Sequence, residues 1–272
     1  MRFYTKHAIL YFLITLCVIA MAINSYLCMD KNTIAQPYLT AIYQNNQKLR
    51  QKYKNLINPN LNVKQQNSIY IVENFLEPEY FKRIKSIVNS QTFTSRNLGL
   101  GLKKGDAINF TKMHENRDYY DVLALYYSNE LTDAFSSILK KPIQRTPLSD
   151  LNAESIIAYV DEKDNINWHF DQSNYYGDRY VALITLVNEN ADKNGLSVAK
   201  FEYKIDGQTH SIQQKENSIM IFKGSEIKHR GTSIDKNEKR VLLSMVLCDI
   251  CQERKDILSN VVEKIKNFVN YG

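Results

Sequence analysis

The segment Trp168-His169-Phe170-Asp171 carries two candidate metal ligands, and a third, His229, follows later in the chain. Residues i and i+2 of a β-strand point to the same face, so His169 and Asp171 can share one metal ion while Phe170 turns away into packing. Two imidazoles and one carboxylate can occupy one face of an octahedron and leave the other positions open. This set is typical of a non-haem iron(II) site, provided that the fold brings His229 back to the segment.

The sequence around this segment predicts a β-rich domain. Short runs rich in Ile, Val, Leu and Tyr, separated by Asp, Asn, Gly and Lys, predict strands. These runs are residues 155–160, 180–187, 198–203, 209–213, 218–222 and 241–248. Apolar spacing predicts helices over 80–89 and 119–141. Strands that follow helices favour an antiparallel sandwich or barrel, so we predict a mainly β fold with flanking helices that buttress one sheet.

Composition limits the size and the partners of the protein. The chain has 272 residues and is 44% apolar, enough for one large domain or two small ones. Its formal charge of +6 is spread among acidic residues, which argues against nucleic acid as a partner. No pattern indicates an oligomeric state. We divide the chain into an anchor or signal peptide (1–29), a stem (30–67) and a folded domain (68–272) with its catalytic core at about 151–248.

The N-terminal segment has the composition of a membrane anchor. Residues 8–29 contain no charged side chain and are long enough to span a bilayer as a helix. Arg2 and Lys6 precede them, which predicts a cytosolic N-terminus and a domain in the secretory lumen or outside the cell. The alternative is a cleaved signal peptide and a secreted protein, because Ala20-Met21-Ala22 is similar to a cleavage site. We favour the uncleaved anchor, since apolar character continues to Met29.

The stem has apolar side chains near helical spacing between residues 37 and 57, which predicts a short amphipathic helix. We interpret it as a spacer between membrane and domain. A dimerising coiled coil is the alternative, but the apolar stripe is too short for several heptads.

Two further motifs have ordinary structural interpretations. Cys248-Asp249-Ile250-Cys251 is a single C-x-x-C motif and therefore a poor zinc site. We interpret it as a strand end with two thiols, and a local disulfide in an oxidising compartment is the alternative. The glycine-rich stretch 98–105 lacks the ending of a phosphate-binding loop, so we predict a mobile loop over the active site.

The order His-x-Asp, distal His and trailing basic residue resembles a known family. Further matching segments are Val72-Glu73-Asn74-Phe75-Leu76, Asp178-Arg179-Tyr180, Asn194-Gly195-Leu196 and Asn217-Ser218-Ile219-Met220-Ile221-Phe222. Together they resemble the iron(II)- and 2-oxoglutarate-dependent oxygenases, within them the prolyl 4-hydroxylase-like branch. The resemblance covers residues 68–248 and implies a double-stranded β-helix, or jelly-roll, in which His169, Asp171 and His229 bind iron(II).

The resemblance also implies a buried cation for the distal carboxylate of 2-oxoglutarate. Lys239 and Arg240 compete for this role. The strand after them has one wholly apolar face, suited to packing on helices: Val241, Leu243, Met245 and Leu247. Its other face is mixed and suited to a cavity: Arg240, Leu242, Ser244 and Val246. We therefore favour Arg240, although the branch usually has Lys at the position of Lys239. A further cosubstrate contact implied by the family is Tyr159.

The implied reaction is the hydroxylation of a C–H bond with iron(II), 2-oxoglutarate and dioxygen, with release of succinate and CO2 and with ascorbate as an accompanying reductant. We expect a prolyl or lysyl side chain of a protein or peptide as the substrate. The sequence departs from the branch at Ala182, where prolyl hydroxylases often have Thr, and at Asn194-Gly195-Leu196-Ser197, which replaces their Gly-Gly-Glu-Thr turn. Prolyl specificity therefore does not follow from the resemblance.

Two other classes of protein remain as alternatives. A cupin-type metal dioxygenase that acts on a small molecule or lipid would keep the three ligands without 2-oxoglutarate. A non-catalytic jelly-roll binding module would need neither the ligands nor the cation. Trp168 is interpreted as a packing residue beside the metal rather than as a substrate platform.

Overall fold

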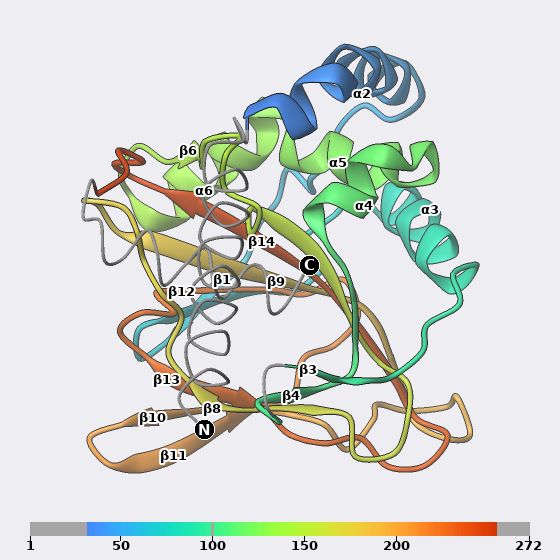
Figure 1. The fold of residues 1–272 in the computed structure, drawn as a ribbon, viewed down its shortest axis with the longest axis vertical. Helices are drawn as coiled ribbons and strands as arrows, with labels where there is room; N and C mark the ends of the chain where they lie inside the picture. Colours follow the sequence, from blue (N-terminus) through green and yellow to red (C-terminus); the bar gives the residue numbers. More distant parts are fainter. Residues whose placement is uncertain (1–31, 99–100, 255–272) are drawn as a thin grey trace, which may run out of the picture.

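The computed structural model describes residues 32–98 and 101–254. Two antiparallel sheets face each other, and the helices lie over the outer face of the larger sheet (Figure 1). This arrangement confirms the predicted mainly β fold with helices that buttress one sheet, since an amphipathic helix and a sheet each need a second layer to bury an apolar face.

The larger sheet is built from eight strands: β1 (Val63–Gln66), β2 (Ile69–Val72), β5 (Asp106–Ile108), β6 (Gln144–Arg145), β7 (Glu154–Tyr159), β9 (Arg179–Glu189), β12 (Ile219–Phe222) and β14 (Lys239–Cys248). Their order is β1-β2-β12-β9-β14-β7-β5, with β6 paired to the end of β14. The central strands β9 and β14 are buried along almost their whole length. They therefore form the rigid wall on which the site is built.

The smaller sheet has six strands: β3 (Asn97–Leu98), β4 (Lys103–Lys104), β8 (Asn165–His169), β10 (Phe201–Ile205), β11 (Gln208–Ile212) and β13 (Lys228–Gly231). Their order is β11-β10-β13-β8-β4-β3. In the stretch 98–105, predicted as a loop, Leu98 and Lys103–Lys104 are thus strand residues of this sheet.

The helices lie on the outer side of the larger sheet, and the first of them packs against α4 and α5 rather than on the sheet itself: α2 (Asn32–Lys52), α3 (Pro78–Asn89), α4 (Phe110–Glu115), the 3-10 helix η1 (Arg117–Tyr119), α5 (Tyr120–Tyr126) and α6 (Asn129–Leu139). The apolar face predicted for β14 lies in the core beneath them, where Val241, Leu243, Met245 and Leu247 are fully buried. Strand alternation therefore assigned both faces of β14 correctly.

The single helix predicted over 119–141 is instead two helices joined at Tyr127 and Ser128. The Ser128 hydroxyl accepts a hydrogen bond from the backbone N–H of Leu131 at 3.3 Å, which caps the start of α6. Serine competes well for this capping role, so the chain can turn between two apolar stretches without losing backbone hydrogen bonds. The apolar periodicity alone did not reveal this break.

Helix α2 begins five residues before the predicted stem helix, at Asn32 rather than Pro37, and it packs on the domain. Ala35 and Ile42 are fully buried in the same core as the sheet, and the Asn46 side chain donates to the Ala124 carbonyl of α5 at 3.0 Å. A spacer would leave this stripe in water. The burial of the stripe places α2 in the folded domain instead.

The predicted membrane-anchored localisation needs correction. Within residues 32–98 and 101–254, none of the helices combines the length and the apolar character needed to cross a bilayer. Residues 8–29, on which the anchor and signal-peptide predictions rested, lie outside the described residues. The lumenal or extracellular placement therefore has no support in the described residues, and we do not carry it further.

Cys248 and Cys251 form a disulfide, so the prediction of two thiols was wrong. Strand β14 ends at Cys248 and the chain then turns, which places the two Cα atoms 5.4 Å apart. That separation is within the usual range for a disulfide.

A buried histidine makes the stability of the fold depend on pH. His114 is fully buried, and its two ring nitrogens lie 2.7 Å from the Phe110 carbonyl oxygen and 2.8 Å from the Tyr127 hydroxyl. Burial lowers the pKa of His114 to about 4. Because the unfolded chain binds this proton more tightly, the contribution of His114 is complete above pH ~6.5 and is lost as pH falls towards 4.

We expect this loss to be about 3 kcal/mol of unfolding free energy. Urea unfolding of the wild type and of His114→Gln at pH 7 and pH 4.5 measures it (the interval is chosen from the linkage relation). The difference in unfolding free energy between the wild type and His114→Gln should be smaller at pH 4.5 than at pH 7 (the interval follows from the linkage relation). An equal difference at both values would contradict the assignment.

Candidate metal centre

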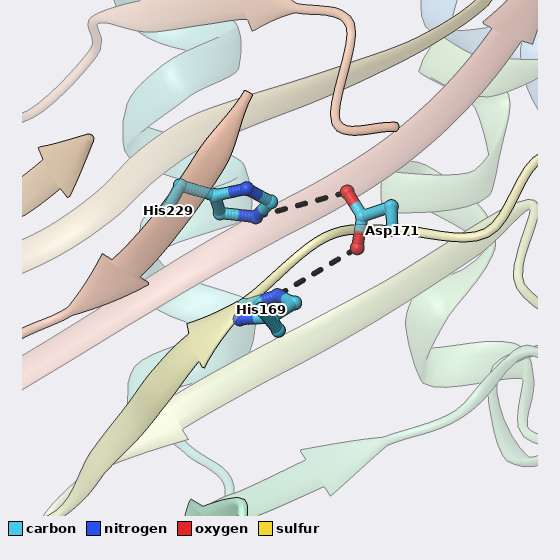
Figure 2. A group of neighbouring side chains, drawn as sticks. All are labelled: His169, Asp171 and His229. Carbon is cyan, nitrogen blue, oxygen red and sulfur yellow. Dashed lines mark ion pairs between the residues drawn. The ribbon is translucent and has the colours of Figure 1, made fainter. Parts of the chain in front are cut away.

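His169, Asp171 and His229 meet between the two sheets (Figure 2). His169 ends β8 and lies directly opposite His229 of β13, which brings their ring centroids within 4.2 Å. Asp171 follows two residues after the end of β8, and its backbone N–H donates to the Gly224 carbonyl at 2.9 Å. Antiparallel pairing therefore returns the distant histidine to the segment that carries the other two residues.

The Asp171 carboxylate lies between the two imidazoles. Its Oδ1 is 3.7 Å from Nε2 of His169, and its Oδ2 is 3.7 Å from Nε2 of His229 (Figure 2). One potential ligand atom from each residue lies within 4.8 Å of the others. This spacing allows all three to approach one metal ion from the same side.

Two details differ from the sequence-based expectation. Asp171 is not on the strand with His169 but in the loop after it, so its position depends on contacts with Gly224 rather than on strand alternation. Phe170 is 52% exposed and does not pack in the interior.

Both histidines present Nε2 to the site. Nδ1 lies 2.7 Å from the Asn167 carbonyl oxygen in His169 and 2.8 Å from the Ile227 carbonyl oxygen in His229. A carbonyl can only accept, so each Nδ1 carries the hydrogen and each Nε2 keeps a free lone pair. Burial lowers the pKa of His229, which favours the neutral form that a metal requires. The donor set therefore fits a divalent metal before any ion is bound.

The Asp171 carboxylate occupies the space that a side chain at position 224 would need. A Cβ at this position would collide with Oδ2 of Asp171 and would also lie 2.7 Å from its Cγ. Only glycine lets the backbone approach a ligand residue this closely.

We expect Gly224→Ala to displace the carboxylate and to weaken iron(II) binding by about 10- to 100-fold, the range seen when the support of a ligand is disturbed. Calorimetric titration of the metal-free protein measures this. Gly195→Ala is the matched control, because its Cβ would meet only the flexible Asn190 side chain. Unchanged affinity in Gly224→Ala would contradict the role of this contact.

A cavity of about 220 Å³ opens beside the three residues. Both sheets line it, and the mixed face predicted for β14 forms part of its wall: Arg240, Leu242, Ser244 and Val246. The predicted cation and the predicted metal ligands thus border one space.

Arg240 is a buried cation without an anionic partner in the described part of the chain. Its side chain is 1% exposed, its Nε makes no hydrogen bond to any described residue, and an Nη donates to the Gln214 amide oxygen at 3.3 Å. Tyr159 lies opposite on β7, with its ring centre 6.0 Å from the guanidinium carbon. A buried cation is costly unless an anion neutralises it, so this position is suited to a carboxylate ligand.

Tyr159 lines the same cavity, and burial raises its pKa to about 12, which keeps its hydroxyl protonated as a donor. Lys239, the other predicted cation, is not among the described residues that line the cavity. Its Nζ donates to the Asn89 side-chain oxygen at 3.0 Å.

Sequence reasoning missed Lys103 and Arg179, whose side chains also line the cavity. Arg179 was part of a matching segment, but only the pairing of β9 with β14 shows which way it faces. Trp168 lies on the other side of β8, with its ring 4.9 Å from Lys204 Nζ and 4.7 Å from the Arg230 guanidinium carbon. It is not among the described cavity residues.

No family model matches the chain, and no curated protein is significantly similar to it. Solved structures do match. An oxidoreductase of the 2OG-Fe(II) oxygenase family from Burkholderia pseudomallei aligns with a TM-score of 0.51 and 10% identity over 70% of this chain and 89% of that one. AviO1 from Streptomyces viridochromogenes Tue57 aligns with a TM-score of 0.51 and 10% identity over 69% of this chain and 93% of that one.

A third similar structure is the non-heme alpha ketoglutarate dependent epimerase SnoN from nogalamycin biosynthesis. It aligns with a TM-score of 0.50 and 10% identity over 76% of this chain and 81% of that one. Likeness at such low identity concerns the fold. The chain therefore has the jelly-roll fold of 2-oxoglutarate- and iron(II)-dependent oxygenases, as the resemblance in its sequence implied.

Proposed function

We propose that this protein is an iron(II)- and 2-oxoglutarate-dependent oxygenase that hydroxylates a C–H bond. One observation carries the proposal: a cluster of two Nε2 atoms and one carboxylate shares a cavity with Arg240, a buried cation that lacks an anion. The first feature suits a facial iron site. The second suits a ligand with a carboxylate at its far end. Solved structures with this fold include a member of the 2OG-Fe(II) oxygenase family.

His169, Asp171 and His229 would hold the metal. Arg240 would bind the distal carboxylate of 2-oxoglutarate through its planar guanidinium group. Tyr159 would donate a hydrogen bond from its hydroxyl to the same ligand. The bound metal supplies the redox chemistry, in which dioxygen converts 2-oxoglutarate to succinate and CO2 and one oxygen atom enters the substrate C–H bond. Apolar side chains, among them Val181, form part of the cavity wall and would limit contact of the bound ligands with water.

For the substrate we propose a prolyl or lysyl side chain of a protein or peptide. The support is the resemblance of the sequence to the prolyl 4-hydroxylase-like branch, and the departure at Ala182 leaves the choice between the two side chains to experiment.

The proposal is tested by incubating the purified chain with iron(II), 2-oxoglutarate, ascorbate and prolyl or lysyl peptides. We expect succinate to form only when both iron(II) and 2-oxoglutarate are present, and a substrate peptide to gain about 16 Da, one oxygen atom. Binding of iron(II) without any binding of 2-oxoglutarate would point to a cupin-type dioxygenase. Binding of neither would leave a jelly-roll binding module.

A further inference from the structure

The residues that line the cavity carry more positive than negative charge, and this excess is the same with or without the metal and the cosubstrate. The described lining of the cavity includes three cationic side chains, Lys103, Arg179 and Arg240, but a single carboxylate, Asp171. Among these lining residues the positive charges therefore exceed the negative ones by two. A divalent metal and the dianion 2-oxoglutarate cancel each other, so the same excess remains when both are bound. An excess of positive charge in a concave site favours an anionic ligand.

Lys103 faces this space from the smaller sheet. It lies directly opposite Ile166 of β8, and both residues line the cavity. Side chains directly opposite each other on paired strands share one face of the sheet. Arg240, which is proposed to bind 2-oxoglutarate, comes from the larger sheet. The two cations therefore approach the cavity from opposite walls.

No acid in the described part of the chain is paired with Lys103. Its Nζ makes no hydrogen bond and no ion pair within 4.0 Å of a described residue, and Asp106 and Asp164 attract it only at longer range. These two acidic groups have other partners: Asp106 accepts from the Ala107 N–H and lies 3.8 Å from Arg96, whereas Asp164 accepts from Ser95 and from two backbone N–H groups.

The adjacent Lys104 shows the contrast. Its Nζ donates to the Glu162 carbonyl and lies 3.8 Å from Asp164, and it is not a cavity residue. Burial lowers the pKa of Lys103 to about 8, so this side chain is still mainly charged at neutral pH. A charged lysine that faces a ligand cavity without an ion-pair partner is suited to bind an anionic group of a ligand.

We propose that Lys103 binds an anionic group of the primary substrate, so that the substrate carries a carboxylate near the carbon that is oxidised. This inference rests on the proposed oxygenase function and narrows its substrate class. The carboxylate can belong to a small acid or to an acidic residue beside a prolyl or lysyl target, and the two sources share the same recognition chemistry.

Calorimetry on the protein loaded with iron(II) and 2-oxoglutarate, without oxygen, tests the proposal. The probes are N-acetylproline and N-acetyllysine, each as free acid and as amide, and tetrapeptides with Asp-Pro or Asn-Pro at their centre. We expect the acid member of a pair to bind at least ~10-fold more tightly than its neutral counterpart, as for a hydrogen bond to a charged group. The free acids represent a small-molecule source and the tetrapeptides a peptide source.

The preference for the acid should disappear in Lys103→Met and persist in Lys103→Arg. Binding by the Lys103→Arg variant would also show that the protein tolerates a substitution at this position. Lys104→Met is the matched control and should keep the preference. Equal binding of acids and amides by the wild type overturns the proposal, as does a preference that survives in Lys103→Met or is lost only in Arg179→Met. Failure of the oxygenase function is a different result, because the wild type would then not bind 2-oxoglutarate at all.

Discussion

Asp171→Asn is expected to lower the affinity for iron(II) by on the order of 100-fold or more, because disturbing the support of a ligand alone already costs 10- to 100-fold. Asp171 is the single carboxylate of the cluster, and each of its oxygens faces one histidine Nε2. Anaerobic calorimetry measures the affinity. Succinate formation should fall with it, since the variant leaves two neutral imidazoles as ligands.

Thermal unfolding separates loss of the metal from loss of the fold. The described residues give Asp171 no lysine or arginine partner, so the metal-free variant should unfold at the wild-type temperature. Added iron(II) should stabilise the wild type by about 2.7 kcal/mol at 100 times its Kd and the variant far less. Glu226→Gln is the control, because this exposed acid lies outside the cavity and pairs with Lys223. An unchanged iron affinity in Asp171→Asn would remove this residue from the proposed site.

Arg240→Leu is expected to weaken binding of 2-oxoglutarate by about 2–5 kcal/mol, the usual loss when one partner of a buried charged pair is removed. This corresponds to roughly 30-fold or more in Kd. Arg240→Lys should recover only part of the affinity, since an ammonium group cannot form the planar bidentate contact. Titration of the iron-loaded protein with 2-oxoglutarate under nitrogen measures both variants.

The stability of the same variant carries independent information. Arg240 is buried and its Nε has no partner in the described structure, so leucine should leave the free energy of unfolding unchanged or raise it in the absence of ligand. Lys239→Met is the matched control. Its Nζ bonds to Asn89 rather than lining the cavity, and affinity for 2-oxoglutarate should not change. Loss of affinity in Lys239→Met but not in Arg240→Leu would reverse the assignment.

Periodicity in the sequence predicted those features that depend on neighbours along one strand or helix. The two faces of β14 are the clearest case, because side chains of an extended strand must alternate whatever packs against them. This alternation separated Arg240 from Lys239, and the structure places only the first of them in the cavity lining. The mainly β fold followed in the same way from the strand-like runs.

Features that depend on contacts between distant segments were predicted poorly. The helix over 119–141 is broken by the cap at Ser128, and the stem helix belongs to the core because α5 covers its apolar stripe. The disulfide depends on a turn after β14. Phe170 is exposed and itself lies beyond the end of β8 at His169, where strand alternation no longer applies. In each case the local pattern allowed two outcomes and packing selected one.

By itself the sequence determined the chemistry available to the site: two imidazoles, one carboxylate, a later cation and a β-rich chain to carry them. Only the tertiary structure decided their arrangement. Pairing of β13 with β8 sets His229 against His169, Gly224 admits the Asp171 carboxylate, and burial leaves Arg240 without an anion. Residue types fix which bonds can form, whereas distances and desolvation between segments far apart in the chain are properties of the packed fold.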